Sequence, residues 1–294
     1  MTRCGIVAIA GRPNAGKSTL LNRLVGERLA LTSPKPQSTR ARVVGLVSDD
    51  TTQLVFLDTP GLLEPADALH DTMRGASLRA LRDADIIVHL ADARNGAPAS
   101  LWTEAGWQGN VPRTPVIVTL NKSDALSPAA RAVIASDHPD ASIVSALTGD
   151  GVDSLLARLR ALAPEGPFLY PPDDISTQSL RFFVAEMVRE TALEELDEEI
   201  PHALACVIEE FREAKKPVYI RAVLYVERDS QKRIVIGTGG ERVREIGRRA
   251  RAKIEPLVGA QVYLDLWVKV LPNWRRDEAA LRRLGYSPTE DRAS

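Results

Sequence analysis

The chain has 294 residues, of which 44% are hydrophobic and 26% are charged, and its formal net charge is −1. These values are ordinary for a globular protein in water, and the length suggests two domains. No window approaches the roughly 18 consecutive apolar residues of a membrane-spanning helix, which argues against an integral membrane protein. The two cysteines, Cys4 and Cys206, have no metal-ligand spacing, so we expect reduced thiols in a cytoplasmic protein. A peripheral contact with the inner membrane stays an open alternative.

Residues 11–18 read GRPNAGKS and match G-x-x-x-x-G-K-[ST], the loop whose backbone N–H groups hold the phosphates of a nucleotide. The apolar run Ile6–Ala10 predicts a strand before this loop, and Ser18–Val25 predicts a helix after it. A bound phosphate would therefore lie at a helix N-terminus, where peptide dipoles favour negative charge. A chance match in a glycine-containing turn is expected in on the order of one chain in a hundred of this size. We expect nucleotide contacts from Gly11, Asn14, Ala15, Gly16, Lys17, Ser18 and Thr19, with Lys17 on the β- and γ-phosphates and Ser18 on Mg²⁺.

Apolar runs alternate with helical patterns between Ile6 and Ala163, which is typical of an α/β domain with a mostly parallel sheet. Ligands of such domains bind at the carboxyl ends of the strands. The expected strands are Ile6–Ala10, Val43–Ser48, Leu54–Leu57, Ile86–Leu90, Val116–Leu120 and Ala141–Val144, and the clearest helices are Met73–Leu81 and Val152–Leu162.

A polar motif, Asp58-Thr59-Pro60-Gly61, follows the run Leu54–Leu57. A carboxylate at this strand end can hold Mg²⁺ through water, and the N–H of Gly61 can meet a γ-phosphate. The alternative is that Asp58 and Gly61 are only turn residues.

A second motif, Asn121-Lys122-Ser123-Asp124, follows the run Val116–Leu120. The two oxygens of Asp124 can accept both donors on one edge of guanine, a pair that adenine lacks. Asn121 would brace the loop and the Lys122 stem would cover the base. Ser145 and Ala146 end the next strand, and the N–H of Ala146 would lie near the guanine oxygen. Together these elements predict GTP, with strong discrimination against adenine nucleotides.

These motifs resemble the G motifs of the Ras-like translation-factor GTPases, and Pro34–Arg40 resembles the effector loop of the Era family. The resemblance implies that Thr39 closes on Mg²⁺ when a γ-phosphate is present. It also implies that Asn14 can coordinate K⁺ beside the phosphates, although Asn14 could instead hydrogen-bond its own loop. Leu62 stands where many related GTPases carry a water-orienting glutamine, so we expect slow intrinsic hydrolysis. The expected catalytic residues are Lys17, Thr39, Gly61 and Asn14, and the expected metal ligands are Ser18, Thr39 and Asp58.

A proline-rich stretch, 166–179, breaks the periodicity and predicts an extended linker between domains at 1–165 and 180–294. Beyond it we expect a helix from Leu180, strands at His202–Phe211 and Val218–Glu227, a glycine-rich turn, a helix at Glu241–Lys253, a strand at Val262–Val270 and a helix near Asp277–Leu284.

The order of these elements resembles a smaller α+β domain, the type II KH domain, whose GxxG loop clamps about four nucleotides of single-stranded RNA. Arginines on the following helix would neutralise phosphates and make binding salt-dependent. The alternative is a tight turn that only caps a helix. The expected RNA contacts are Ile236, Gly237, Thr238, Gly239, Gly240, Arg242, Arg244, Arg248 and Arg249.

Because both halves carry these motifs in family order, the chain is identified as a member of the Era family. The resemblance implies a GTP-hydrolysing switch that binds GTP or GDP with Mg²⁺ and, through Asn14, K⁺. It further implies that the partner is the 3′ end of 16S ribosomal RNA in the small (30S) subunit, and we expect a monomer. The alternatives are an RNA-binding protein with a structural GTP domain and a GTPase that assists tRNA modification.

Overall fold

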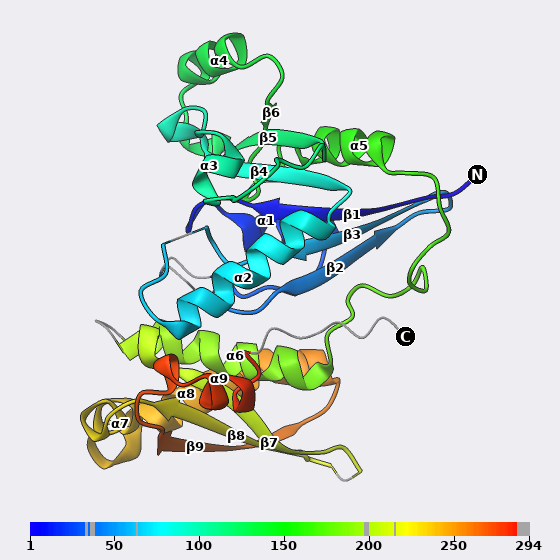
Figure 1. Cartoon of the computed structure of the whole chain (residues 1–294). Coiled ribbons are helices and arrows are strands. Elements are labelled where there is room, and N and C mark those ends of the chain that lie inside the picture. Colours follow the sequence, from blue (N-terminus) through cyan, green and yellow to red (C-terminus); the bar gives the residue numbers. More distant parts are fainter. Residues whose placement is uncertain (33–34, 36–38, 63, 197–199, 215, 287–294) are drawn as a thin grey trace. The chain divides into compact units, whose positions relative to one another are not determined.

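The structure is a computed structural model that describes residues 1–32, 35, 39–62, 64–196, 200–214 and 216–286. The chain divides into two compact units (Figure 1). One comprises Met1–Thr32, Thr39–Ala66 and His70–Thr177, and Gln178–Ser294 makes up the bulk of the other. Of the predicted effector loop, Pro34–Arg40, the structure describes Lys35, Thr39 and Arg40, and the other residues of the loop lie outside the described residues.

The first unit is built on a six-stranded sheet with the order β2-β3-β1-β4-β5-β6. β2 is antiparallel to β3 and the other neighbours are parallel, so the predicted α/β fold with a mostly parallel sheet is confirmed. The strands are β1 (Arg3–Ala10), β2 (Val43–Ser48), β3 (Thr52–Asp58), β4 (Ile86–Asp92), β5 (Val116–Asn121) and β6 (Ser142–Ile143). The α-helices are α1 (Lys17–Val25), α2 (Ala68–Asp83), α3 (Leu101–Glu104), α4 (Pro128–Asp137) and α5 (Val152–Leu162).

The central strands are longer than the apolar runs that predict them. β3 is buried along its whole length and includes Thr52, Gln53 and Asp58. Strands with both faces covered read as continuous apolar runs, so hydrophobicity locates them but does not set their ends. The carboxyl ends of β1, β3, β4 and β5 bring the motif residues to one edge of the sheet.

The predicted linker is not a free spacer. The Oε1 atom of Gln53 accepts hydrogen bonds from the backbone N–H groups of Leu169 (2.8 Å) and Tyr170 (3.0 Å). The N–H of Leu46 in β2 donates to the carbonyl of Ile175 at 2.9 Å. The stretch is extended, as its prolines predict, but it lies along the first unit and is held there by hydrogen bonds.

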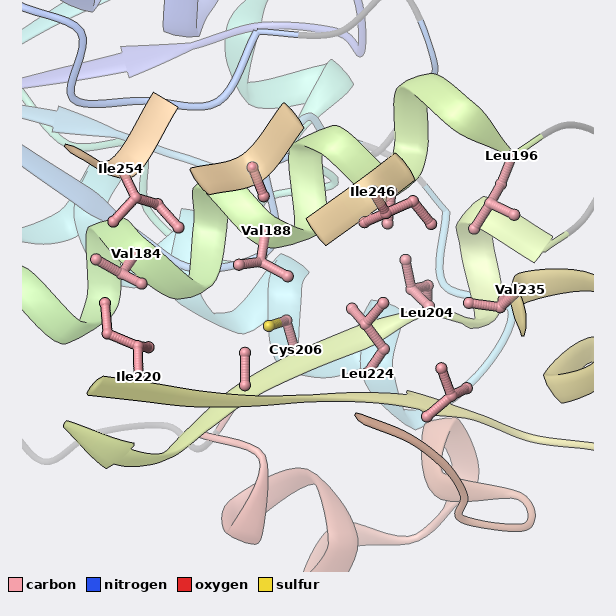
Figure 2. Packing of buried hydrophobic residues seen from close by; sticks show 14 of the residues in the cluster. Val184, Val188, Leu196, Leu204, Cys206, Ile220, Leu224, Val235, Ile246 and Ile254 are labelled. Carbon is pink, nitrogen blue, oxygen red and sulfur yellow. The ribbon is translucent and has the colours of Figure 1, made fainter. Parts of the chain in front are cut away.

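The second unit is a three-stranded sheet, in the order β7-β8-β9, covered by helices α6 and α8. β7 is antiparallel to β8, and β8 is parallel to β9. Alternate residues of β8, from Val218 to Val226, point into a core shared with α6 and α8 (Figure 2). The elements are α6 (Leu180–Glu195), β7 (Ala205–Arg212), β8 (Val218–Val226), α7 (Asp229–Ile236), α8 (Glu241–Val258), β9 (Val262–Val270) and α9 (Glu278–Arg283).

One predicted strand boundary in this unit is corrected, and one helix is present that was not predicted. The strand expected from His202 begins at Ala205, because Ile200–Ala203 forms a 3₁₀ turn. The apolar residues before the glycine-rich turn belong to α7, where Gln231 accepts hydrogen bonds from the N–H groups of Glu227 (2.9 Å) and Arg228 (3.1 Å). This side-chain cap fixes the start of a helix that the sequence pattern does not predict.

Within the described residues, none of the helices has the length and apolar character needed to cross a membrane. Cys4 and Cys206 are both buried free thiols. Burial raises the pKa of the Cys206 thiol well above its ordinary range, which keeps it protonated and unreactive.

Candidate nucleotide site and nucleic-acid groove

The phosphate loop joins the end of β1 to the start of α1. Gly16 caps the helix in the left-handed region (φ 95°), and no side chain caps the first turn. The N–H groups of that turn, which includes Ser18 and Thr19, therefore face the loop without a side-chain acceptor. Lys17 is buried, and its Nζ donates to the carbonyls of Gly11 (3.1 Å) and Arg12 (3.0 Å). Burial lowers the pKa of Lys17 to about 8, so an incoming phosphate would stabilise a charge that the free protein holds poorly.

The three expected Mg²⁺ ligands lie together. The Ser18 hydroxyl donates to Asp58 Oδ2 at 2.7 Å and lies 2.8 Å from the Thr39 hydroxyl. Asp58 Oδ1 is buried and makes no hydrogen bond to any described residue. Burial raises the pKa of Asp58 to about 6, although the charge of Lys17 and the hydroxyls of Ser18 and Thr39 act the other way. A buried carboxylate with one unpaired oxygen beside two hydroxyls fits a hard divalent cation.

Gly61 packs directly against the phosphate loop. A Cβ at this position would lie 2.8 Å from the backbone nitrogen of Pro13, so only glycine fits. The N–H of Leu62 donates to the carbonyl of Gly11 at 3.1 Å, and the Leu62 side chain is part of the hydrophobic core. Leu62 therefore ties the two motifs together and holds its side chain away from solvent.

The base-recognition motif is braced through Asn121. Its Nδ2 donates to the carbonyl of Ala15 at 2.9 Å, and its Oδ1 accepts the N–H of Ala146 at 2.9 Å. The expected role of Asn121 as a brace thus has a geometric basis. The N–H of Ala146, expected near the guanine oxygen, is directed at Asn121 in this structure. Asp124 Oδ1 accepts the Ser145 hydroxyl at 2.5 Å, which fixes the carboxylate that would face the base.

Asp92 belongs to this site, although the sequence analysis does not select it. It accepts hydrogen bonds from Lys122 Nζ (3.0 Å) and Arg94 Nη2 (2.6 Å), and the Arg94 hydrogen bonds hold its pKa well below the ordinary range. A pocket of about 390 Å³ is lined by Asp92, Lys122, Asn14 and Ala15 among others. Asp92 ends β4 at the same sheet edge as the other motifs, and this position is the signal that could have identified it.

Gly16→Ala is expected to lower the free energy of unfolding by about 2–5 kcal/mol and to remove nucleotide binding. The alanine would have to keep the left-handed φ of Gly16, and its Cβ would lie 2.3 Å from Asn121 Nδ2. This clash would break the hydrogen bond by which Asn121 braces the phosphate loop.

Gly26→Ala is the matched control, because Gly26 has a similar φ (82°) with open space around it. That change should cost only about 1–2 kcal/mol. Urea unfolding and titration with a fluorescent GTP analogue measure both effects; equal losses in the two variants would contradict the clash.

The glycine-rich turn of the second unit lies between α7 and α8. Gly237 and Gly240 cap these helices with positive φ (75° and 79°), and Gly239 also has a positive φ (57°). A Cβ on Gly237 would lie 2.8 Å from that of Arg242, whereas Gly239 has open space around it. Thr238 and Gly239 are exposed, and Ile236 is half-buried against the core. The turn thus presents bare backbone to solvent, as an RNA clamp requires.

The arginines of α8 fall on different faces. Arg244 and Arg248 line a groove of about 390 Å³ between α8 and β9. Arg242 and Arg244 also donate to carbonyls of the turn region, those of Ile234 (2.9 Å) and Gly240 (3.0 Å) respectively. Arg249 instead pairs with Glu194 and Glu195 on α6, so the structure does not place this expected RNA contact in the groove. Arg251 also lines the groove, although it is not among the expected RNA contacts, and its helical spacing from Arg244 and Arg248 could have added it to them.

The first unit is thus a P-loop domain with guanine-selective chemistry, and the second is a KH-like domain with a basic groove. Two family descriptions agree: "50S ribosome-binding GTPase" matches residues 6–122, and "KH domain" matches residues 199–275.

Full-length relatives are also similar. GTPase Era of Lactobacillus delbrueckii subsp. bulgaricus is 39% identical over 98% of this chain and 97% of its own length. Aquifex aeolicus Era bound to GDP·AlF4⁻ is 38% identical with a TM-score of 0.90, over 97% of this chain and all of that one. Era in complex with MgGDPNP and nucleotides 1506–1542 of 16S ribosomal RNA gives the same identity and TM-score, over 98% of this chain and all of that one. The chain belongs to the Era family of GTPases. It binds guanine nucleotide and hydrolyses GTP.

Proposed function

We propose that this GTPase is a switch that binds the 3′ end of 16S ribosomal RNA during assembly of the 30S subunit. The observation that carries the proposal is the likeness, along nearly the whole chain, to an Era structure that holds MgGDPNP and nucleotides 1506–1542 of that RNA. The bare GxxG backbone beside Arg244, Arg248 and Arg251 supports it, because these residues line a groove in which arginines could neutralise phosphates.

In the proposed nucleotide complex, Ser18 and Thr39 bind Mg²⁺ directly and Asp58 binds it through water. The proximity of the three oxygens supports this assignment. Thr39 lies at the end of the effector loop, so its engagement would couple loop order to the γ-phosphate. Lys17 and the N–H of Gly61 would stabilise charge on the phosphoryl oxygens during in-line attack by water. Because Leu62 is buried and apolar, no side chain there can orient this water, and we expect slow intrinsic hydrolysis.

The RNA-binding proposal is tested with a Thr238→Asp/Gly239→Asp double variant. Two carboxylates in the exposed turn repel phosphate, so RNA affinity should fall by roughly 10- to 100-fold, while GTP hydrolysis by the folded protein stays intact. Gly259→Asp is the control, because Gly259 also has a positive φ (67°) with open space but lies at the other end of α8. Affinity for the 16S segment is measured by fluorescence anisotropy. If the double variant binds as tightly as the control, the GxxG turn is only a helix cap.

The proposed K⁺ site rests on Asn14, which adopts a left-handed conformation (φ 61°) in the phosphate loop. A K⁺ ion there would add positive charge beside the transferring phosphoryl group. We expect hydrolysis to be faster in KCl than in NaCl, on the order of 10²-fold at most, and Asn14→Ala to remove the difference. Asn95→Ala, which alters the same pocket outside the phosphate loop, should retain it. Equal rates of the wild-type protein in the two salts would rule out this site.

A further inference from the structure

The KH-like sheet has an outer face, turned away from α6 and α8, that carries aromatic side chains together with paired basic and acidic ones. In the strand register, Tyr219 lies opposite both Tyr263 and Arg212, and Val223 lies opposite Trp267. The alternate residues of β8 point into the core, so these positions point the other way. The pattern is not that of an ordinary solvated face, which would be polar.

The aromatic rings are assembled and open to solvent. Tyr219 and Tyr263 stack with ring centroids 5.9 Å apart and an interplanar angle of 13°. The Arg212 guanidinium lies 5.3 Å from the Tyr219 ring centroid. Tyr263 and Trp267 are 59% and 52% exposed. Exposed rings backed by guanidinium groups are the features of surfaces on which nucleobases stack.

Asp265 lies between Tyr263 and Trp267 in β9, and its carboxylate accepts hydrogen bonds from neighbouring side chains of the same face. It accepts from the Tyr219 hydroxyl (2.7 Å), Arg221 Nε (3.1 Å) and Trp267 Nε1 (2.8 Å). Burial acts to raise the pKa of Asp265, but these three donors hold it below the ordinary value. The carboxylate therefore orients the indole, and its charge is offset where an RNA phosphate would otherwise be repelled.

This face is continuous with the groove beside the GxxG turn. β9 is the edge strand, and Tyr263 and Asp265 line the groove together with Arg244, Arg248 and Arg251. A strand of RNA that leaves the groove can cross β9 onto the outer face without a gap. The RNA in the similar Era complex runs from nucleotide 1506 to 1542, far beyond the about four nucleotides that a GxxG groove clamps.

We propose that Tyr263 and Trp267 form a stacking platform for single-stranded RNA, which extends the GxxG groove onto the outer face of β9. The inference rests on the proposed RNA-binding function. The two rings are four residues apart, about 13 Å along the strand, and so provide two separate base-stacking positions. Stacking on bare rings discriminates little between bases, so the platform adds affinity and direction rather than sequence selectivity.

The test compares two RNAs, the 1506–1542 segment and a five-nucleotide piece that only the groove can hold. Trp267→Ala should weaken binding of the long RNA by about 5- to 150-fold and leave the short RNA unaffected. Tyr263 also lines the groove, so Tyr263→Ala should weaken both RNAs and the long one more. Tyr263→Phe and Trp267→Phe keep a ring and should bind both RNAs nearly as the wild-type protein does. The long RNA should also quench a component of tryptophan fluorescence that is missing in Trp267→Phe.

The possible results separate the two proposals. Loss of long-RNA binding in the alanine variants alone supports the platform. Unchanged long-RNA binding in those variants overturns it and leaves this face to a protein partner, while the groove proposal stands. An equal loss in Trp267→Phe assigns the effect to the hydrogen bond that Trp267 donates to Asp265 and also overturns it. If the wild-type protein binds neither RNA, both proposals fail.

Discussion

Lys17→Met is expected to reduce the rate of GTP hydrolysis by at least about 10²–10³-fold. The loss follows from the position of Lys17 as a buried cation in the phosphate loop, next to Asp58. A methionine of similar length fills the space but supplies no charge for the β- and γ-phosphates. The increase in melting temperature that GTP gives to the wild-type protein should also disappear.

In the free variant, removal of the buried charge favours folding, whereas loss of the two hydrogen bonds of Lys17 and of its charge next to Asp58 opposes it. Burial lowers the pKa of Lys17 from 10.5 to about 8, so the charged lysine costs the free folded state up to roughly 3 kcal/mol. Below pH 8 the wild-type protein bears this cost in full, because Lys17 is charged in both the folded and the unfolded state. Methionine has no charge and removes the cost. The stability of the variant relative to the wild-type protein should therefore fall as the pH rises from 8 towards 10.5.

Single-turnover hydrolysis and thermal unfolding test this expectation together. Arg82→Met, an exposed cation in the last turn of α2, is the control and should change neither measurement appreciably. If Lys17→Met hydrolyses GTP within a few-fold of the wild-type rate, a group other than Lys17 must stabilise the negative charge on the γ-phosphate.

The nucleotide site was predictable because its residues sit in short motifs at strand ends. The order of the parallel sheet brings Ser18 and Asp58 within hydrogen-bond distance although they are 40 residues apart. Once the strands are recognised, the meeting of their carboxyl ends follows from topology. Asp92 was not predicted as a site residue, because the apolar run that predicts the strand ends at Leu90, two residues before the end of β4.

Two helices, α4 and α7, were not predicted, for different reasons. α4 carries a local signal, since Ser127 caps its first turn (3.2 Å to the N–H of Ala130) and Pro128 is its first residue. It buries none of its residues, so it has no apolar stripe to detect. α7 depends on the Gln231 cap, and the orientation of Arg249 depends on carboxylates of α6 far away in the sequence. The Gln231 cap is local, but the N-cap residue is Arg228 and not one of the usual capping residues. The partners of Arg249 are tertiary and leave no mark in the local sequence.

Asp124→Asn is expected to change the preference of the protein from GTP to XTP. Asp124 can accept both the N1–H and the 2-amino group of guanine, and Ser145 holds the carboxylate in place. Asparagine offers one acceptor and one donor, so one guanine donor faces another donor. Two hydrogen bonds to a charged group are worth about 3–6 kcal/mol, and GTP affinity should fall by roughly 10²–10⁴-fold. Xanthine has a carbonyl in place of the 2-amino group, which matches the asparagine amide.

Titration of the variant with GTP and XTP measures both changes, and XTP hydrolysis should recover towards the wild-type GTP rate. Asp153→Asn, an exposed carboxylate in the first turn of α5, is the control and should keep GTP selectivity. The Ser145 hydroxyl can still donate to the asparagine oxygen, so the loop should keep its fold. A variant that loses GTP without gaining XTP would mean that the carboxylate braces the loop instead of reading the base.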